Sequence, residues 1–490
     1  MNKDSPDQHT TPLDQGRPEH LPDHPGSQEA GSLQRPMTRR SALKTLGAFS
    51  ALGFMGPLFR SSAFAQVSRG KRPNILFILS DDHRWDFLSC TGHPFLQTPS
   101  LDRLARQGIL FSNAFVTTAL CSPSRASFLT GQYAHTHGVR NNLTTWNDDN
   151  VTFLERIKNA GYDTAFIGKW HMPGRLPHLR GVDHFATFTA QAGQGHYWNC
   201  PILVDGVERP SRKPYITEEL TDLALAFIEK PRENPFCLYL AHKAVHHDFS
   251  PPPDLAHLYD DWKAPLPKEA DPWVTSTRGA MWAGTLGPLE SLYKNYCRVV
   301  VALDREIGRL LNRLDELDLA EDTVVVYAGD NGYFWGEHRL VDKRWAYEES
   351  IRIPFIVRHP RLIPYAGRRA EQMVLNIDLA PTLLELAGLP VPGDMEGQSF
   401  LPVLESPRVK GRKAWLYEYF KDFPYNVPEI KAVRTGQHMY IEYEGGRTPE
   451  LYDVITDPRE KSNLIMTPEG SRLLPELRGM LQALKKGERL

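Results

Sequence analysis

Short runs of apolar residues alternate with helical periodicity along most of the chain. The runs, typical of strands buried on both faces, cover residues 75–79, 164–167, 236–240, 323–327 and 354–357. Between them, apolar residues recur at spacings of three and four, most clearly over residues 292–317. This alternation predicts an α/β fold: a large, mostly parallel or mixed sheet between two layers of helices.

The pattern changes near residue 406. Residues 438–443 form an alternating, aromatic segment, and a helical pattern follows near residues 473–484. We therefore predict a large α/β domain over residues 70–405 and a smaller C-terminal α+β subdomain over residues 406–490, built on a short antiparallel sheet.

The N-terminal residues have the composition of a targeting segment. Residues 1–36 contain six prolines and few large apolar groups, so we expect a disordered extension. Residues 37–65 combine paired arginines, a short apolar run and an Ala-x-Ala site, the pattern of a twin-arginine signal peptide. A buried amphipathic helix is the alternative. We expect export by the twin-arginine translocase to a periplasmic or secreted location, without stable membrane insertion, because the apolar run is too short to span a bilayer.

Overall charge and cysteine content narrow the function. The 490 residues include 57 Lys+Arg and 59 Asp+Glu, a formal net charge of -2 that argues against a nucleic-acid partner. The five cysteines include no C-x-x-C pair, so neither a zinc ribbon nor a disulfide framework is indicated.

Polar side chains follow four of the predicted strands. They are Asp81 and Asp82, Lys169 and His171, His246 and His247, and Asp330 and Asn331. Ligands in open α/β sheets bind beyond the carboxyl ends of strands, so we expect these side chains to meet. Oxygen ligands suit calcium or magnesium, and Lys and His suit an anionic substrate. Taken singly, each group has a simpler interpretation as a helix cap, a turn or a packed surface lysine.

Cys121 is predicted to lie at the start of a helix. Ser122 followed by Pro123 indicates a helix start with Ser122 as the N-cap, and such a position favours an anion. From these residues alone, Cys121 is either a thiolate nucleophile or an inert buried cysteine.

The CSPSR sequence at 121–125, followed by LTG at 129–131, resembles the signature of the type I, formylglycine-dependent sulfatases of the alkaline phosphatase superfamily. The chain also resembles bacterial exported carbohydrate sulfatases, and the likeness runs from about residue 73 to residue 463. Matching pieces follow in order at Asp81-Asp82, residues 168–171, residues 329–332, residues 336–338 and residues 342–344.

This resemblance implies roles for individual residues. Asp81, Asp82, Asp330 and Asn331 would bind one divalent cation, usually calcium, and Cys121, oxidised to formylglycine (3-oxoalanine), would complete the site. Arg125 would hold the formylglycine hydrate. Lys169, His171, His246 and Lys343 would surround the sulfate, with His246 chosen over His247 from spacing. The resemblance also implies a partner, the formylglycine-generating or another sulfatase-maturing enzyme.

The implied activity is that of a sulfuric ester hydrolase that releases inorganic sulfate. One hydroxyl of the aldehyde hydrate attacks sulfur and forms a covalent sulfate ester. The other hydroxyl then collapses to the aldehyde and expels the sulfate, a route that a serine or a thiol would lack. Export and loop aromatics favour a sulfated glycan over another small molecule, although packing is the favoured explanation for each aromatic taken singly: Tyr197, Trp198, Trp262, Trp273 and Trp282. The alternatives are a phosphoester or phosphonate monoester hydrolase of the same superfamily and a non-catalytic exported anion-binding protein.

Overall fold

The computed structural model describes residues 72–174, 176, 179–274 and 287–490. The predicted N-terminal extension and signal peptide lie outside these residues. The described residues all belong to one compact unit of the chain, Ser61–Leu490. None of the helices in the described ranges combines the length and the apolar character needed to cross a bilayer.

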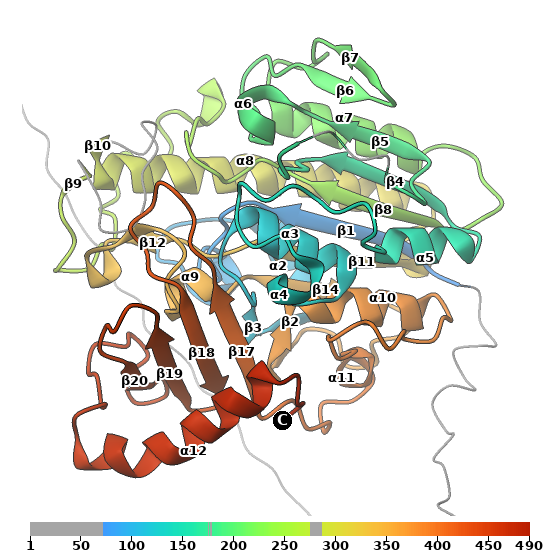
Figure 1. Ribbon diagram of the computed structural model, residues 1–490. Coiled ribbons are helices and arrows are strands. Elements are labelled where there is room, and N and C mark those ends of the chain that lie inside the picture. Colours follow the sequence, from blue (N-terminus) through green and yellow to red (C-terminus); the bar gives the residue numbers. More distant parts are fainter. Residues whose placement is uncertain (1–71, 175, 177–178, 275–286) are drawn as a thin grey trace, which may run out of the picture. The chain divides into compact units, whose positions relative to one another are not determined.

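A mixed sheet of ten strands forms the centre of the fold (Figure 1). In spatial order its strands are β15 (Arg368–Ala370), β2 (Ile109–Phe111), β14 (Phe355–Arg358), β11 (Thr323–Gly329), β1 (Asn74–Ser80), β8 (Phe236–Ala241), β4 (Asp163–Gly168), β5 (His184–Thr187), β6 (Ile202–Val204) and β7 (Val207–Arg209). The central strands β11, β1, β8 and β4 are parallel, whereas β14 runs antiparallel to β11 and β6 runs antiparallel to β5. All five predicted strands are confirmed.

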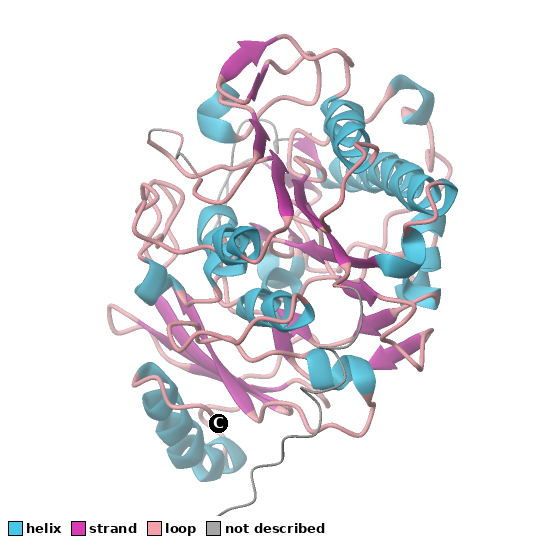
Figure 2. Cartoon of the chain, turned by 90° about the vertical axis from the view of Figure 1, so that its right-hand side faces the viewer, coloured by secondary structure: helices cyan, strands magenta, loops and turns pink. Residues whose placement is uncertain are grey.

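Side chains of β1 alternate between two hydrophobic cores. Phe77 and Leu79 face one core with α3 (Cys121–Thr130), α5 (Phe153–Asn159) and α10 (Leu379–Leu386). Leu76 and Ile78 face the other core with α2 (Pro99–Arg106), α7 (Ile216–Ile228) and α8 (Leu289–Glu316). Helices therefore cover both faces of the sheet, as Figures 1 and 2 show. The predicted helix over residues 292–317 is confirmed as α8, which begins three residues earlier.

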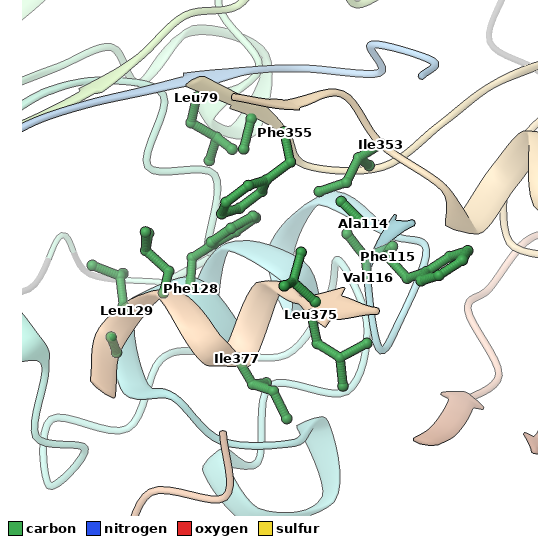
Figure 3. Close-up of a cluster of buried hydrophobic side chains, with 14 of the residues drawn as sticks. Leu79, Ala114, Phe115, Val116, Phe128, Leu129, Ile353, Phe355, Leu375 and Ile377 are labelled. Atoms are coloured by element: carbon green, nitrogen blue, oxygen red, sulfur yellow. The ribbon is translucent and has the colours of Figure 1, made fainter. Parts of the chain in front are cut away.

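Helix α3 carries Cys121 as its first residue and is anchored to the sheet by its apolar side chains. Phe128 lies 5.3 Å from Phe77, measured between ring centroids, and Figure 3 shows it beside Leu79 and Phe355. The prediction that Ser122 is the N-cap is wrong. The N-cap is Leu120, which provides no side-chain hydrogen bond, and the Ser122 hydroxyl instead donates to the His171 carbonyl. That bond joins the start of α3 to the segment after β4.

The C-terminal residues form the predicted small antiparallel sheet. It consists of β17 (Ala414–Tyr419), β18 (Ile430–Thr435), β19 (His438–Tyr443) and β20 (Glu450–Asp453). On one face, Leu416 and Val433 pack against α12 (Pro468–Lys485). On the other face, Trp415 and Tyr417 join the core that contains α3. The small sheet is therefore held between its own helix and the main α/β body (Figure 2).

Shorter elements connect these layers. They are β3 (Ala114–Phe115), α4 (Ala134–His137), α6 (Ala190–Gly193), β9 (Trp273–Val274), β10 (Gly287–Pro288), β12 (Phe334–Trp335), β13 (Val341–Asp342), α9 (Glu348–Ile351), β16 (Val374–Leu375), α11 (Leu401–Glu405) and the 3-10 helices η1 (Ser89–Thr91), η2 (Pro253–Leu255), η4 (Ala320–Asp322), η5 (Glu337–Arg339) and η6 (Asn376–Asp378).

Gly168 ends β4 in a conformation and a space that suit only glycine. Its φ is +112°, and an added Cβ would lie 1.9 Å from the Ala241 carbonyl oxygen of β8. We expect Gly168→Ala to lower the free energy of unfolding by about 2 kcal/mol or more, measured by urea denaturation. Gly393→Ala is the control, because an added Cβ there would have no described atom within 4 Å apart from its own chain neighbours. Equal unfolding midpoints for the two variants would contradict the argument.

Candidate active site

The four parallel strands deliver their polar side chains to one edge of the sheet. Ser80 of β1 pairs with Gly329 of β11, Leu79 pairs with Ala241 of β8, and Ala241 pairs with Gly168 of β4. Because these strands end in register, the residues that follow them leave the sheet at the same level. The expectation that the strand-end residues meet is confirmed by the contacts described below.

Three carboxylates converge at this edge. Oxygen atoms of Asp81, Asp82 and Asp330 lie within 4.8 Å of one another, and all three residues are fully buried. Asp82 Oδ2 and Asn331 Oδ1 have no hydrogen-bond partner among the described residues. Burial raises the pKa of Asp82 to about 7, with Asp81 and Asp330 opposing its ionisation further. Burial and Asp81 also raise the pKa of Asp330.

This donor set fits a divalent cation. Hard cations such as calcium take several carboxylate and amide oxygens, and the two unpartnered oxygens are of these kinds. A bound cation would also offset the mutual repulsion of the three carboxylates. The four predicted metal ligands besides residue 121 are thus brought together, in an arrangement that can hold such an ion.

Three cationic side chains surround the carboxylates. Arg125 Nε donates to Asp330 Oδ2 over 2.9 Å, and the Lys169 and Lys343 ammonium groups contact Asp81 and Asp82 respectively. Burial alone would raise the pKa of Asp81, but Lys169 and Arg125 outweigh it and lower that pKa. Three cationic side chains gathered at one place can also bind an anion.

Cys121 lies between these charges. Its Sγ is 3.5 Å from Asp81 Oδ1 and 3.2 Å from Lys343 Nζ, and the residue is fully buried. Burial and the Asp81 charge raise the pKa of the thiol. An unmodified Cys121 is therefore a neutral thiol and a poor nucleophile, which counts against the thiolate interpretation.

Both predicted histidines border the same cluster. His246 Nε2 lies 3.7 Å from Asp82 Oδ2, and Nδ1 donates to the His247 carbonyl over 2.8 Å. His171 Nε2 accepts a hydrogen bond of 2.7 Å from the Gln194 amide. Burial lowers the pKa of His246 and of His171, so both imidazoles are neutral. The Nδ1 bond of His246 leaves the lone pair on Nε2, toward the carboxylates.

Two polar residues of this region, the half-buried Gln194 and the buried Lys243, were not among the predicted site residues. Gln194, next to α6, joins Lys169 to His171, because its Oε1 accepts from Lys169 Nζ over 2.5 Å. Lys243 follows β8, and burial and the Lys169 charge lower its pKa to about 8. The position of Lys243 after a buried strand was a usable signal in the sequence, whereas nothing there distinguishes Gln194.

The loop aromatics divide by exposure. Tyr197 is buried and its hydroxyl donates to the His246 carbonyl, while Trp198 Nε1 donates to Ser250. Both therefore serve packing and support. Trp262 and Trp273 are half exposed, and Trp282 lies outside the described residues.

Comparison with known proteins gives the class. A sulfatase family model matches residues 73–389, and a model of the N-sulphoglucosamine sulphohydrolase C-terminal region matches residues 336–487. The first match spans well over half of the chain, so the protein belongs to the sulfatase family. It is a sulfuric ester hydrolase, of a family that uses formylglycine and a divalent cation.

Individual relatives extend this result. An N-acetylglucosamine-6-O-sulfatase of Bacteroides thetaiotaomicron is 33% identical, covering 87% of this chain and 88% of the relative. The human N-acetylglucosamine-6-sulfatase is 29% identical over 81% of this chain and 75% of its own. A solved structure described as BT4656 in complex with its substrate D-glucosamine-2-N,6-O-disulfate aligns with a TM-score of 0.79 and 31% identity, covering 85% of this chain and 98% of that one.

Proposed function

We propose that the protein removes the 6-O-sulfate group from a glucosamine-type residue of a sulfated glycan. The observation that carries this proposal is the likeness, over nearly the whole chain, to a named 6-O-sulfatase and to a structure with a 6-O-sulfated glucosamine bound. Membership of the sulfatase family also favours it over the phosphoester and phosphonate alternatives.

We propose the following roles within the site. Asp81, Asp82, Asp330 and Asn331 hold a calcium ion, whose chemistry is to bind and polarise oxygen atoms at this edge. Formylglycine at position 121 would supply a hydrated aldehyde. One of its hydroxyl groups would serve as the nucleophile, and the other would allow the aldehyde to re-form and release sulfate.

The remaining residues stabilise charge, bind the sulfate or transfer protons. Lys343 Nζ, 3.2 Å from the Cys121 Sγ position, stabilises a deprotonated oxygen there. Arg125, fixed on Asp330, offsets the negative charge of the same group. The Lys169 ammonium and His171, joined through Gln194, bind the sulfate and the bridging oxygen. His246 keeps a lone pair on Nε2 and would accept the proton of the attacking hydroxyl, while the Lys169 ammonium would give a proton to the leaving alcohol oxygen.

Maturation and export complete the proposal. A formylglycine-generating or other maturing enzyme would convert Cys121, and the twin-arginine translocase would export the protein to the periplasm or beyond. The paired arginines and the Ala-x-Ala site in residues 37–65 support this route.

A positional panel tests the substrate. We expect kcat/KM for N-acetylglucosamine 6-sulfate to exceed that for the 3-sulfate and for galactose 6-sulfate by about 10²-fold or more, because a site that hydrogen-bonds a particular hydroxyl pattern rejects its isomers. Released inorganic sulfate is measured with calcium-loaded enzyme. Faster hydrolysis of N-acetylglucosamine 6-phosphate would favour a phosphoesterase. Matured, metal-loaded protein without turnover on any ester would favour the anion-binding alternative.

A further inference from the structure

A second group of metal-ligating side chains lies apart from the carboxylate cluster of the active site. It consists of His338 in η5, Glu349 in α9 and Glu460, which follows β20 in the C-terminal part of the chain. One ligand atom from each lies within 4.8 Å of the others, and His338 Nε2 is 3.9 Å from Glu349 Oε2.

All three ligand atoms lack a hydrogen-bond partner in the described part of the chain. They are His338 Nε2, Glu349 Oε2 and Glu460 Oε1. Glu460 is 1% exposed and Glu349 is 6% exposed, so water does not solvate them freely. Buried polar atoms are nearly always paired, and an unpartnered buried carboxylate is costly. Three such atoms converging on one point indicate that a ligand normally occupies it.

The nearby arginines are already engaged by other carboxylates. Arg84 pairs with Asp86 and with Glu337 at 2.6 and 2.7 Å. Arg434 pairs with Glu348 at 2.9 Å. Neither arginine therefore forms an ion pair with the buried acids Glu349 and Glu460.

Local electrostatics point the same way. Burial and the charge of Glu337 raise the pKa of Glu349 to about 8, and burial and Glu348 raise the pKa of Glu460. Burial lowers the pKa of His338, which leaves a neutral imidazole able to donate a lone pair. A divalent cation bound here would favour ionisation of both acids, and two carboxylates with one neutral imidazole would then match its charge.

We propose that His338 Nε2, Glu349 Oε2 and Glu460 Oε1 bind a second divalent cation, of the zinc or manganese class. An imidazole nitrogen beside two carboxylate oxygens suits these metals, whereas calcium prefers oxygen alone. Metal–ligand distances of about 2.0–2.2 Å allow two ligand atoms of one ion to lie at most about 4 Å apart. The 3.9 Å separation of His338 Nε2 and Glu349 Oε2 meets this limit. Water completes the coordination.

This cation has a structural role. Glu460 belongs to the C-terminal part of the chain, whereas His338 and Glu349 flank the segment that carries Lys343 of the active site. Glu460 Oε2 already accepts a 2.9 Å hydrogen bond from the Glu348 amide, so the two parts meet here. The cation therefore fixes the Lys343 segment against the C-terminal subdomain. The proposal does not depend on the identity of the sulfated substrate.

Metal content tests the site. Metal is removed from the wild-type enzyme with a chelator, and excess Ca²⁺ is added to fill the carboxylate cluster of the active site. The protein is then dialysed against Zn²⁺, and its metal content is measured by elemental mass spectrometry. We expect one zinc per chain in the wild type and none in Glu460→Gln or Glu349→Gln. Glu444→Gln is the matched control, because Glu444 is an exposed acid of the same subdomain and should keep the zinc. Zn²⁺ should also raise the wild-type melting temperature by about 3 °C or more.

A spectroscopic measurement needs no variant. Co²⁺ added to calcium-loaded wild type should give a visible absorption band that equimolar Zn²⁺ removes. The proposal is overturned if wild type takes up neither Zn²⁺ nor Co²⁺, or if Glu460→Gln and Glu349→Gln retain as much zinc as Glu444→Gln.

Discussion

Replacing Cys121 with alanine should abolish sulfate release, by at least about 10⁴-fold, the order of loss seen when a covalent nucleophile is removed. The side chain lies among Asp81, Lys169 and Lys343 at the start of α3, with the ligand groups of the site built around it. Its own thiol is neutral, because burial and Asp81 raise its pKa. The proposed mechanism therefore requires the modified residue, and alanine cannot be modified. The fold should persist, because removal of one buried sulfur leaves only a small cavity.

The measurement combines sulfate release with intact mass. Active wild type should be lighter than the sequence predicts by about 18 Da, the loss expected when a thiol becomes an aldehyde. Cys121→Ser is the matched variant: it retains a hydroxyl nucleophile but lacks the second hydroxyl, so it should release at most one equivalent of the alcohol and keep the sulfuryl group as a stable serine ester, with no inorganic sulfate released. Active enzyme with an unaltered thiol at position 121 would refute the formylglycine mechanism.

Sequence reasoning located the site because the site follows the topology of the sheet. Apolar runs identified β1, β4, β8 and β11, and parallel strands in register bring their next residues to one edge. Asp81, Lys169 and Asp330 could therefore be placed together before any contact was known.

Features that depend on loops could not be placed this way. Gln194 meets Lys169 and His171 because a loop returns to the sheet edge, and no periodicity or motif records that return. The helix cap was also misjudged, because the preference of serine for N-cap positions is weak beside the tertiary bond from Ser122 to the His171 carbonyl. The second group of metal-ligating side chains joins residues 338, 349 and 460, which are too far apart in the sequence for a local pattern to connect them.

Replacing Asp330 with asparagine should remove the catalytic cation and most of the activity together. Asp330 Oδ1 accepts from the Asp82 amide over 2.9 Å, and Oδ2 pairs with Arg125 over 2.8 Å. Asparagine keeps the shape but loses the charge, so it both weakens the donor set and leaves the buried Arg125 guanidinium without its main partner. Breaking a buried pair from one side costs about 3–5 kcal/mol of stability.

The expected loss in kcat/KM is about 10³-fold or more, since a metal ion contributes several kcal/mol of transition-state stabilisation. Calcium per chain and sulfate release are measured on the same dialysed samples. Asp304→Asn is the control, because Asp304 is also buried but caps the start of α2, accepting from the Leu101 amide over 2.8 Å. It should lose stability while keeping calcium. The metal assignment fails if Asp330→Asn retains wild-type calcium, or if it stays fully active after chelation.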